Sequence, residues 1–246
     1  MIYEWEHIVY IIVTIGMMVL GVWLIHRFAK KEKTQKIILI VTSLVLLINI
    51  ILNRIAIVIR YNNFWQLIPT SLCGLTSLLF PISIFIFIKF LNHVVFHWYV
   101  YSALIGGMIA IFYPNFLGQD NPYGSGIPSS FWYFPSITGL LHHTISIFLV
   151  VLLISFFNFR SKLKYWYANP IGYIIYIVFG LFTIQVTNLN DSMNIYEPIV
   201  PGLTWYLLLA IITIISFFII LFYEKIVQKK LKNIELKLRY ENKGKN

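Results

Sequence analysis

The amino-acid sequence predicts an all-α, polytopic membrane protein: a bundle of seven transmembrane helices in a single domain, residues 1–246. Of the 246 residues, 59% are apolar or aromatic and 11% are charged, whereas about a quarter of a soluble domain is charged. Apolar stretches of about 20 residues, enough to cross a bilayer as a helix, recur along the chain. No segment alternates as a barrel strand does. These features exclude a soluble domain, and the high hydrophobicity excludes a disordered chain.

Short connections separate the predicted helices. Their apolar stretches cover residues 8–25, 37–59, 72–88, 94–113, 136–157, 171–189 and 204–223. Each can satisfy its own backbone hydrogen bonds, as a segment in lipid must. Pro69 is predicted as the first residue of the third helix, and Pro81 inside that helix predicts a kink. Residues 114–135, rich in Gly, Pro and aromatic residues, are interpreted as a connecting loop on the outer side.

The basic residues orient the bundle. Seventeen of the 19 Lys and Arg residues lie in the connections between helices one and two, three and four, and five and six, or in the tail at residues 224–246. Because basic residues concentrate on the cytoplasmic side, the N-terminus is predicted outside and the C-terminus in the cytoplasm. This segregation explains the net charge of +10 without a nucleic-acid partner. Glu4 and Glu6 stand where a signal peptide carries positive charge, so no cleavable signal is expected.

The predicted outer ends of the helices carry a cysteine and two histidines. Cys73 is the one cysteine, so no intrachain disulfide can form. It lies near the start of the third helix, where backbone N–H groups activate a thiol; the alternative is a small buried apolar residue. His142 and His143 lie at membrane depth in the fifth helix. They are candidates for a general base, or for packing residues bonded to a neighbouring carbonyl.

Further polar residues lie at the same predicted depth. Asn190 and Asp191 follow the sixth helix, where either could orient an imidazole as the third member of a catalytic triad does, or cap the helix. His7 begins the first helix. Arg54, in the second helix, could hold a phosphate with two hydrogen bonds or extend to the interface. A nucleophile, a base and an orienting group at one depth are the composition of a thiol acyl-transfer site.

A second pair of histidines lies at the predicted cytoplasmic end. His93 and His97 are four residues apart on the fourth helix, so they share one helix face and could bind a metal. No Cys, Asp or Glu lies near them in the sequence. They are therefore interpreted as interfacial residues, and no metal site is predicted.

Several short motifs together resemble a known family. They are His7 in EWEHIVYI, Pro69 before Leu72-Cys73, His142 in LLHHTI, Asn190 with Pro198 eight residues later, and Trp205-Tyr206. The chain resembles, over nearly its whole length, the YwaF-like bacterial integral membrane proteins, relatives of the transmembrane-protein-164 acyltransferases. It departs from the family pattern at His143, where Gly is usual, at Asp191, where Tyr is usual, and at Ser71, a position that is often polar and larger.

The resemblance implies a cell-membrane acyltransferase that moves a fatty acyl chain between a phospholipid and a lysophospholipid. Cys73 would be the nucleophile and His142 or His143 the base, with Asn190 or Asp191 fixing the imidazole. His7, Arg54 and Tyr206 would bind substrate, and no metal or diffusible cofactor is implied. Three other functions stay open: lipid hydrolysis, with water as the acceptor; a transporter or channel lined by Arg54 and the outer histidines; and a seven-helix protein without catalytic activity.

Overall fold

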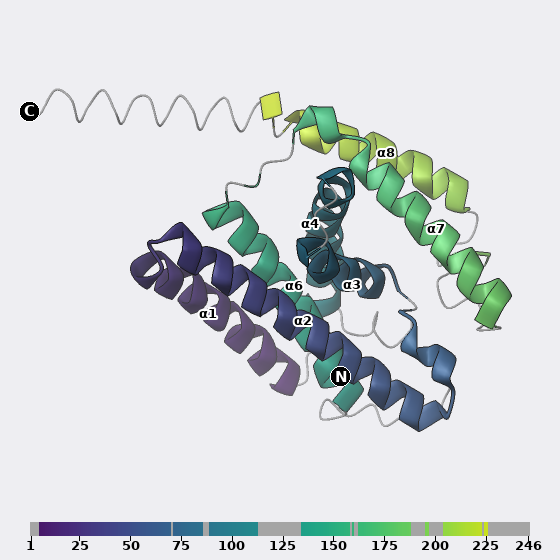
Figure 1. The fold of residues 1–246 in the computed structure, drawn as a ribbon, viewed down its shortest axis with the longest axis horizontal. Coiled ribbons are helices and arrows are strands. Elements are labelled where there is room, and N and C mark those ends of the chain that lie inside the picture. The colour runs from purple at the N-terminus through teal and green to yellow at the C-terminus, as the bar shows by residue number, and fades with distance from the viewer. Residues whose placement is uncertain are drawn as a thin grey trace, which may run out of the picture.

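A computed structural model of the chain describes residues 5–69, 71–85, 89–112, 134–157, 159, 162–187, 195–196, 204–222 and 224–225. Within these ranges it contains seven α-helices, two short 3₁₀-helices and no strand (Figure 1). The α-helices are α1 (Trp5–Phe28), α2 (Glu32–Tyr61), α3 (Leu72–Phe85), α4 (Lys89–Phe112), α6 (Phe134–Phe156), α7 (Ala168–Thr187) and α8 (Trp205–Phe222). The 3₁₀-helices are η1 (Phe64–Leu67) and η3 (Leu163–Tyr165).

The helices alternate in direction, as short connections require. At one end of the bundle, the first residues of α1 meet the last of α4, where His7 Nε2 lies 2.7 Å from the carbonyl oxygen of Ile111. At the same end, Asn49 in the second half of α2 donates a hydrogen bond to the carbonyl of Thr138 at the start of α6. This end therefore gathers the starts of α1 and α6 and the ends of α2 and α4.

The opposite end is held by contacts of η3. The ring of Tyr165 in η3 stacks on that of His93, near the start of α4, with centroids 4.7 Å apart. The backbone N–H of Leu163 donates to the carboxylate of Glu224, just beyond α8. The start of α4, the connection between α6 and α7 and the end of α8 thus lie together, as the alternation of seven predicted spans requires.

Two apolar clusters fill the interior around α3 and α4, which lie between the α2–α6 pair and the α7–α8 pair (Figure 1). In the first cluster, Phe80 of α3 stacks on Tyr99 of α4 with ring centroids 4.0 Å apart, and both side chains are fully buried. In the second, Trp98 of α4 packs on α7 at Gly172. A Cβ built on Gly172 would lie 2.3 Å from the indole ring, so only glycine allows this close approach.

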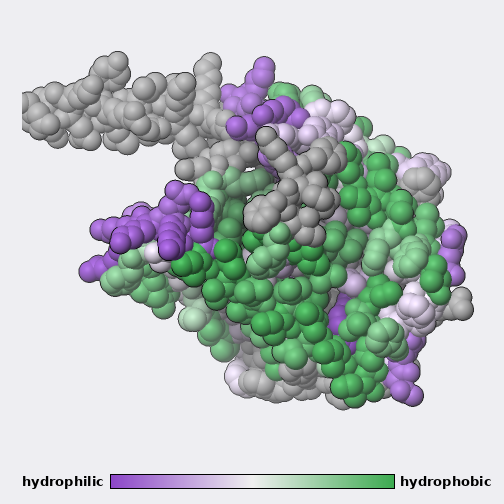
Figure 2. Space-filling model, viewed as in Figure 1, coloured by the Kyte–Doolittle hydropathy of each residue, from purple (hydrophilic) through white to green (hydrophobic). Residues whose placement is uncertain are grey.

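The exterior is apolar where it would face lipid. Figure 2 shows apolar residues over the middle of the visible face and hydrophilic residues towards its margins, including the turn between α1 and α2. Five helical segments of the described chain are long and apolar enough to cross a membrane, and two apolar segments, Leu72–Phe85 and Leu209–Phe222, are shorter. The all-α, multi-pass membrane prediction is confirmed. The count of seven crossings and the orientation of the termini stay predictions.

Each predicted span corresponds to one α-helix, with differences at the ends. Helix α2 begins at Glu32, five residues before the predicted start, and its first turn carries a 2.7 Å ion pair between Glu32 and Lys36. The prediction that the third helix begins at Pro69 is wrong, because α3 begins at Leu72. Pro81 lies inside α3, which continues to Phe85. The predicted outer loop is described only at residues 134–135, and the basic tail only at residues 224–225.

Candidate active site

Ser71 fixes the start of α3. Its hydroxyl oxygen accepts a hydrogen bond from the backbone N–H of Gly74 at 3.1 Å, the bond that an N-cap residue makes. Its carbonyl accepts from the N–H of Leu75 at 2.9 Å. Cys73 is therefore the second residue of the helix. It lies in the first turn, where N–H groups have no acceptor within the helix and the helix dipole favours negative charge. This placement suits a thiolate better than a start at Pro69 would.

The thiol of Cys73 lies against a glycine on the next helix. A Cβ built on Gly106 of α4 would be 2.6 Å from Sγ, so only a glycine at this position leaves room for the sulfur. Cys73 is partly buried. The hydroxyl of Tyr99, also on α4, is close enough to Cys73 for an electrostatic interaction.

His142 on α6 meets α3 one turn below the thiol. Its Nε2 lies 2.8 Å from the hydroxyl oxygen of Ser77, and the ring also has a hydrogen bond with the backbone of Cys73. The two rings of His142 and His143 stack, with centroids 4.5 Å apart and an interplanar angle of 21°. Of the two histidines, His142 is thus the one with hydrogen bonds to α3.

A chain of buried hydroxyl groups continues from His142 into the bundle. Ser77 Oγ lies 3.1 Å from Ser146 Oγ, and the hydroxyl of Tyr99 donates to the carbonyl of Ser146 at 3.4 Å. Ser77, Tyr99 and Ser146 are each at most 2% exposed. Helices α3, α4 and α6 therefore converge on one polar cluster, made of Cys73, Ser77, Tyr99, His142 and Ser146.

Arg54 brings a positive charge to this cluster at the head of α3. Its Nη2 lies 3.5 Å from the position of a Cβ built on Gly74, at the head of α3, and it interacts electrostatically with His142. Asn53, its neighbour on α2, donates to the hydroxyl of Thr138 at 2.6 Å. That bond holds this part of α2 against α6.

The comparison with protein families is decisive at the level of family. The model of the TMEM164 family matches residues 2–223, nearly the whole chain. The chain belongs to the TMEM164 family. No curated protein matches it, and no solved structure matches it either. Together with the apolar helices, the match makes this a multi-pass membrane protein.

The structure brings four of the predicted site residues of this TMEM164-family chain together: Cys73, His142, His143 and Arg54. His7 is 1% exposed and bonded to the carbonyl of Ile111, in the manner of a packing histidine. Tyr206 does not join the cluster either. Tyr206 is 62% exposed at the start of α8, which packs mainly on α7. Asn190 and Asp191 lie outside the described residues.

Ser77 and Ser146 are members of the cluster that sequence reasoning missed. A signal for them exists in the sequence of the TMEM164-family chain. Ser77 follows Cys73 by four residues and Ser146 follows His142 by four residues. Residues four apart share one face of a helix, so each serine lies one turn beyond a predicted catalytic residue and on its side of the helix.

The second histidine pair of the TMEM164-family chain lies in aromatic surroundings. His97 is 3% exposed, its Nδ1 is 2.8 Å from the carbonyl of His93, and its ring lies against Phe159 and Tyr165. Among the described residues, no group of three or more potential metal ligands occurs. The pair is part of the packing between α4 and η3, and His97 is more deeply buried than an interfacial residue would be.

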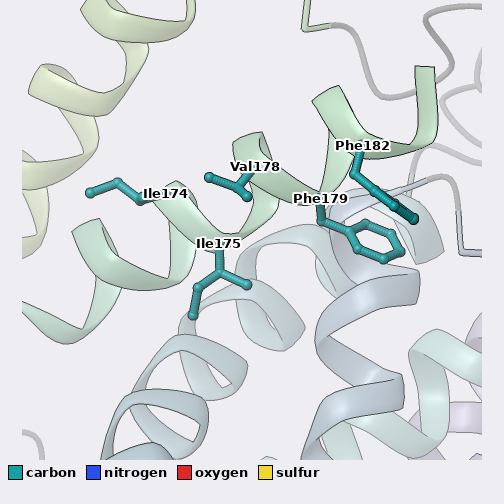
Figure 3. Close-up of a pocket in the computed structure, with 5 residues that line it drawn as sticks. All are labelled: Ile174, Ile175, Val178, Phe179 and Phe182. Atoms are coloured by element: carbon teal, nitrogen blue, oxygen red, sulfur yellow. The ribbon is translucent and has the colours of Figure 1, made fainter. Parts of the chain in front are cut away.

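An apolar groove runs along α7, away from the polar cluster. It has a volume of about 420 Å³ and is lined by Ile174, Ile175, Val178, Phe179 and Phe182 (Figure 3). All five side chains are hydrocarbon, and Val178 is 61% exposed. In a membrane protein such a surface faces lipid chains.

Proposed function

We propose that this TMEM164-family protein is a membrane acyltransferase that moves a fatty acyl chain between a phospholipid and a lysophospholipid. The observation that supports it is the position of Cys73, in the first turn of α3 and beside His142. A thiol at a helix start with a neighbouring imidazole is the usual arrangement of an activated cysteine. The apolar exterior gives direct access to substrates dissolved in the bilayer.

The first half-reaction transfers the acyl chain to the enzyme. His142 takes the thiol proton of Cys73, and the thiolate attacks the ester carbonyl of a phospholipid. The carbon–sulfur bond forms, the ester carbon–oxygen bond breaks, and His142 returns the proton to the departing lysophospholipid oxygen. Backbone N–H groups in the first turn of α3 that have no acceptor within the helix would stabilise the oxyanion. His143 stacks on the His142 ring, with centroids 4.5 Å apart.

The second half-reaction releases the chain to an acceptor. His142 takes the proton of the lysophospholipid hydroxyl, whose oxygen attacks the thioester carbonyl. The new ester bond forms, the carbon–sulfur bond breaks, and the proton returns to Cys73. The same site gives lipid hydrolysis if water replaces the hydroxyl. Whether the enzyme transfers or hydrolyses the acyl chain depends on how well the site excludes water.

Arg54 is proposed to bind the phosphate group of the substrate. A guanidinium binds phosphate oxygens through two parallel hydrogen bonds, which an ammonium group cannot do. Arg54→Lys is expected to raise KM for phospholipid several-fold with a smaller change in kcat. The measurement is acyl exchange against phospholipid concentration in detergent micelles. An Arg54→Lys enzyme with unchanged KM would remove Arg54 from the binding site.

The location of the reaction follows from the predicted orientation. With the N-terminus outside, the starts of α1, α3 and α6 lie at the outer leaflet of the cell membrane, and Cys73 with them. We place the chain in the YwaF-like bacterial branch of the family on its sequence motifs. The orientation is tested by labelling an introduced cysteine in the tail, in the Cys73→Ala background, from either side of sealed vesicles.

The decisive experiment captures the acyl-enzyme. Purified protein is incubated with a phospholipid that carries an alkyne-tagged acyl chain, and the label on Cys73 is measured before and after hydroxylamine, which cleaves thioesters. Because the sequence has one cysteine, the assignment is unambiguous. We expect hydroxylamine-sensitive label in the wild type and none in Cys73→Ser, together with acyl exchange to added lysophospholipid. Folded wild-type protein with neither label nor exchange refutes the proposal, and solute transport that survives Cys73→Ala would favour a transporter.

A further inference from the structure

We propose that Ser77 is the positioning residue of His142, the role that sequence reasoning gave to Asn190 or Asp191. The inference deepens the proposed function and rests on its assignment of His142 as the base. The question is which group holds the imidazole of His142 towards Cys73 before the reaction begins. The observations that support it are the hydrogen bonds of Ser77 and their contrast with those of other hydroxyl groups.

Hydroxyl groups in these helices usually bond within their own helix. Ser and Thr in a helix tend to donate to the carbonyl three or four residues earlier. This is seen for Thr42 with Ile38, Ser43 with Leu39 and Thr213 with Leu209. Such bonds satisfy the hydroxyl within its own helix and indicate no further role.

Ser77 differs, because its hydroxyl meets two side chains on another helix. One is the Nε2 atom of His142 at 2.8 Å and the other is the hydroxyl of Ser146 at 3.1 Å. Ser77 is 2% exposed and Ser146 1% exposed, so water does not compete for these bonds. A hydroxyl held by a second hydroxyl keeps its position when the imidazole changes its protonation state.

The bond of Ser77 fits the task of holding a general base. The Ser77 hydroxyl lies at Nε2 of His142, and the backbone of Cys73 makes a further hydrogen bond with the ring. A hydroxyl oxygen can accept from Nε2–H in both protonation states of the imidazole, so the proton is exchanged with the thiol at the other ring nitrogen, Nδ1.

Three other groups that can be charged face the ring. His143 stacks on it from the same helix, Arg54 approaches from α2, and Cys73 lies on α3. None of the three is changed by substitution of Ser77. A change in thiol reactivity in a Ser77 variant therefore reports on the position of the imidazole.

The test uses alkylation of Cys73, which does not depend on acyl transfer. Full-length protein reacts with a small uncharged reagent, N-ethylmaleimide, across a range from mildly acidic to mildly alkaline pH. In Ser77→Ala we expect the rate at neutral pH to fall about tenfold, a factor equal to about 1.4 kcal/mol, and the pH–rate profile to move to higher pH. Ser146→Ala, which loosens Ser77 without touching the ring, should show a smaller shift in the same direction.

The matched control is Ser102→Ala. Ser102 donates to the hydroxyl of Thr76 at 2.9 Å, a buried bond that also joins α3 to α4. Its loss disturbs the packing of α3 to a similar degree but leaves His142 in place. We expect its alkylation rate and pH profile to match the wild type. If Ser77→Ala behaves like Ser102→Ala, the positioning role is refuted.

A double-mutant cycle separates positioning from general structural damage. If Ser77 acts through His142, then Ser77→Ala adds no further effect in the His142→Ala background. An additive effect overturns the inference, as does unchanged alkylation in His142→Ala alone. The outcome is separate from the proposed function: slowed alkylation in Ser77→Ala without acyl exchange in the wild type refutes the transferase and leaves the positioning role. Acyl exchange in the wild type with unchanged alkylation in Ser77→Ala supports the transferase and refutes the positioning role.

Discussion

Gly106 offers the sharpest test of the site, because its lack of a side chain makes room for the thiol. In Gly106→Ala, the new Cβ would lie 2.6 Å from Sγ of Cys73, far closer than two such atoms can approach. Overpacking of a rigid core costs about 1–3 kcal/mol. Here the sulfur ends a single rotatable bond, so rotation to another staggered position relieves the clash. Alanine also favours the helix by up to about 1 kcal/mol over glycine. The free energy of unfolding should therefore change by less than about 1 kcal/mol.

The functional effect should be much larger than the effect on stability. Rotation moves the sulfur by more than the roughly 1 Å of misplacement that costs a reaction about 100-fold. We expect the rate of thioester formation on Cys73 to fall about 100-fold in Gly106→Ala. The rate is measured by the hydroxylamine-sensitive label from the tagged phospholipid, and folding by thermal unfolding in detergent.

The control for this prediction is Gly16→Ala. A Cβ built on Gly16 of α1 meets no atom within 4 Å, so both the rate and the unfolding temperature should stay near those of the wild type. A folded Gly106→Ala protein that forms the thioester at the wild-type rate would refute the reasoning. It would mean that the observed position of Sγ is not the reactive one.

Two further predictions concern the helix contacts. Gly172→Ala would place a Cβ 2.3 Å from the rigid ring of Trp98, so we expect a loss of at least about 1–3 kcal/mol in unfolding free energy. The control is Gly139→Ala, which should be neutral because a Cβ there meets no atom within 4 Å. Denaturant unfolding in detergent distinguishes the two variants. His7→Ala removes the bond to the Ile111 carbonyl and should lower unfolding free energy by about 1 kcal/mol, with an unchanged rate of thioester formation; a large loss of rate in folded His7→Ala would instead assign His7 to the site.

The positions of the described apolar helices could be predicted because lipid sets simple rules. A spanning helix needs about 20 apolar residues, and the apolar stretches have no competing interpretation. The helix ends were less accessible, since they depend on local hydrogen bonds. The start of α3 is the instructive case. Pro69 has the features of a first helical residue, but the hydroxyl of Ser71 accepts from the N–H of Gly74, and the helix begins at Leu72, three residues later. That shift moves Cys73 into the first turn.

The unusual residues of the candidate site could be identified from the sequence, but the hydrogen bonds among them could not. Cys73, His142 and Arg54 are conspicuous because each is unusual in an apolar helix. A serine is not, because its hydroxyl can bond to its own helix at little cost. Ser77 therefore carries no signal by residue type alone. Its position one turn beyond Cys73 becomes informative only when α6 places His142 and Ser146 opposite the same face.

The histidines show why depth alone does not identify a catalytic residue. His7 and His142 have the same sequence signature, a histidine near the predicted outer end of an apolar helix. The structure gives His7 a carbonyl acceptor on α4, a bond that joins two helices. It gives His142 a hydroxyl partner that can both donate and accept, and a contact with the residue that bears the thiol. A general base exchanges its proton with the nucleophile and must therefore lie within reach of it. By that criterion His142, which contacts the residue that bears the thiol, is suited to the role, and His7, which is bonded to the end of α4, is not.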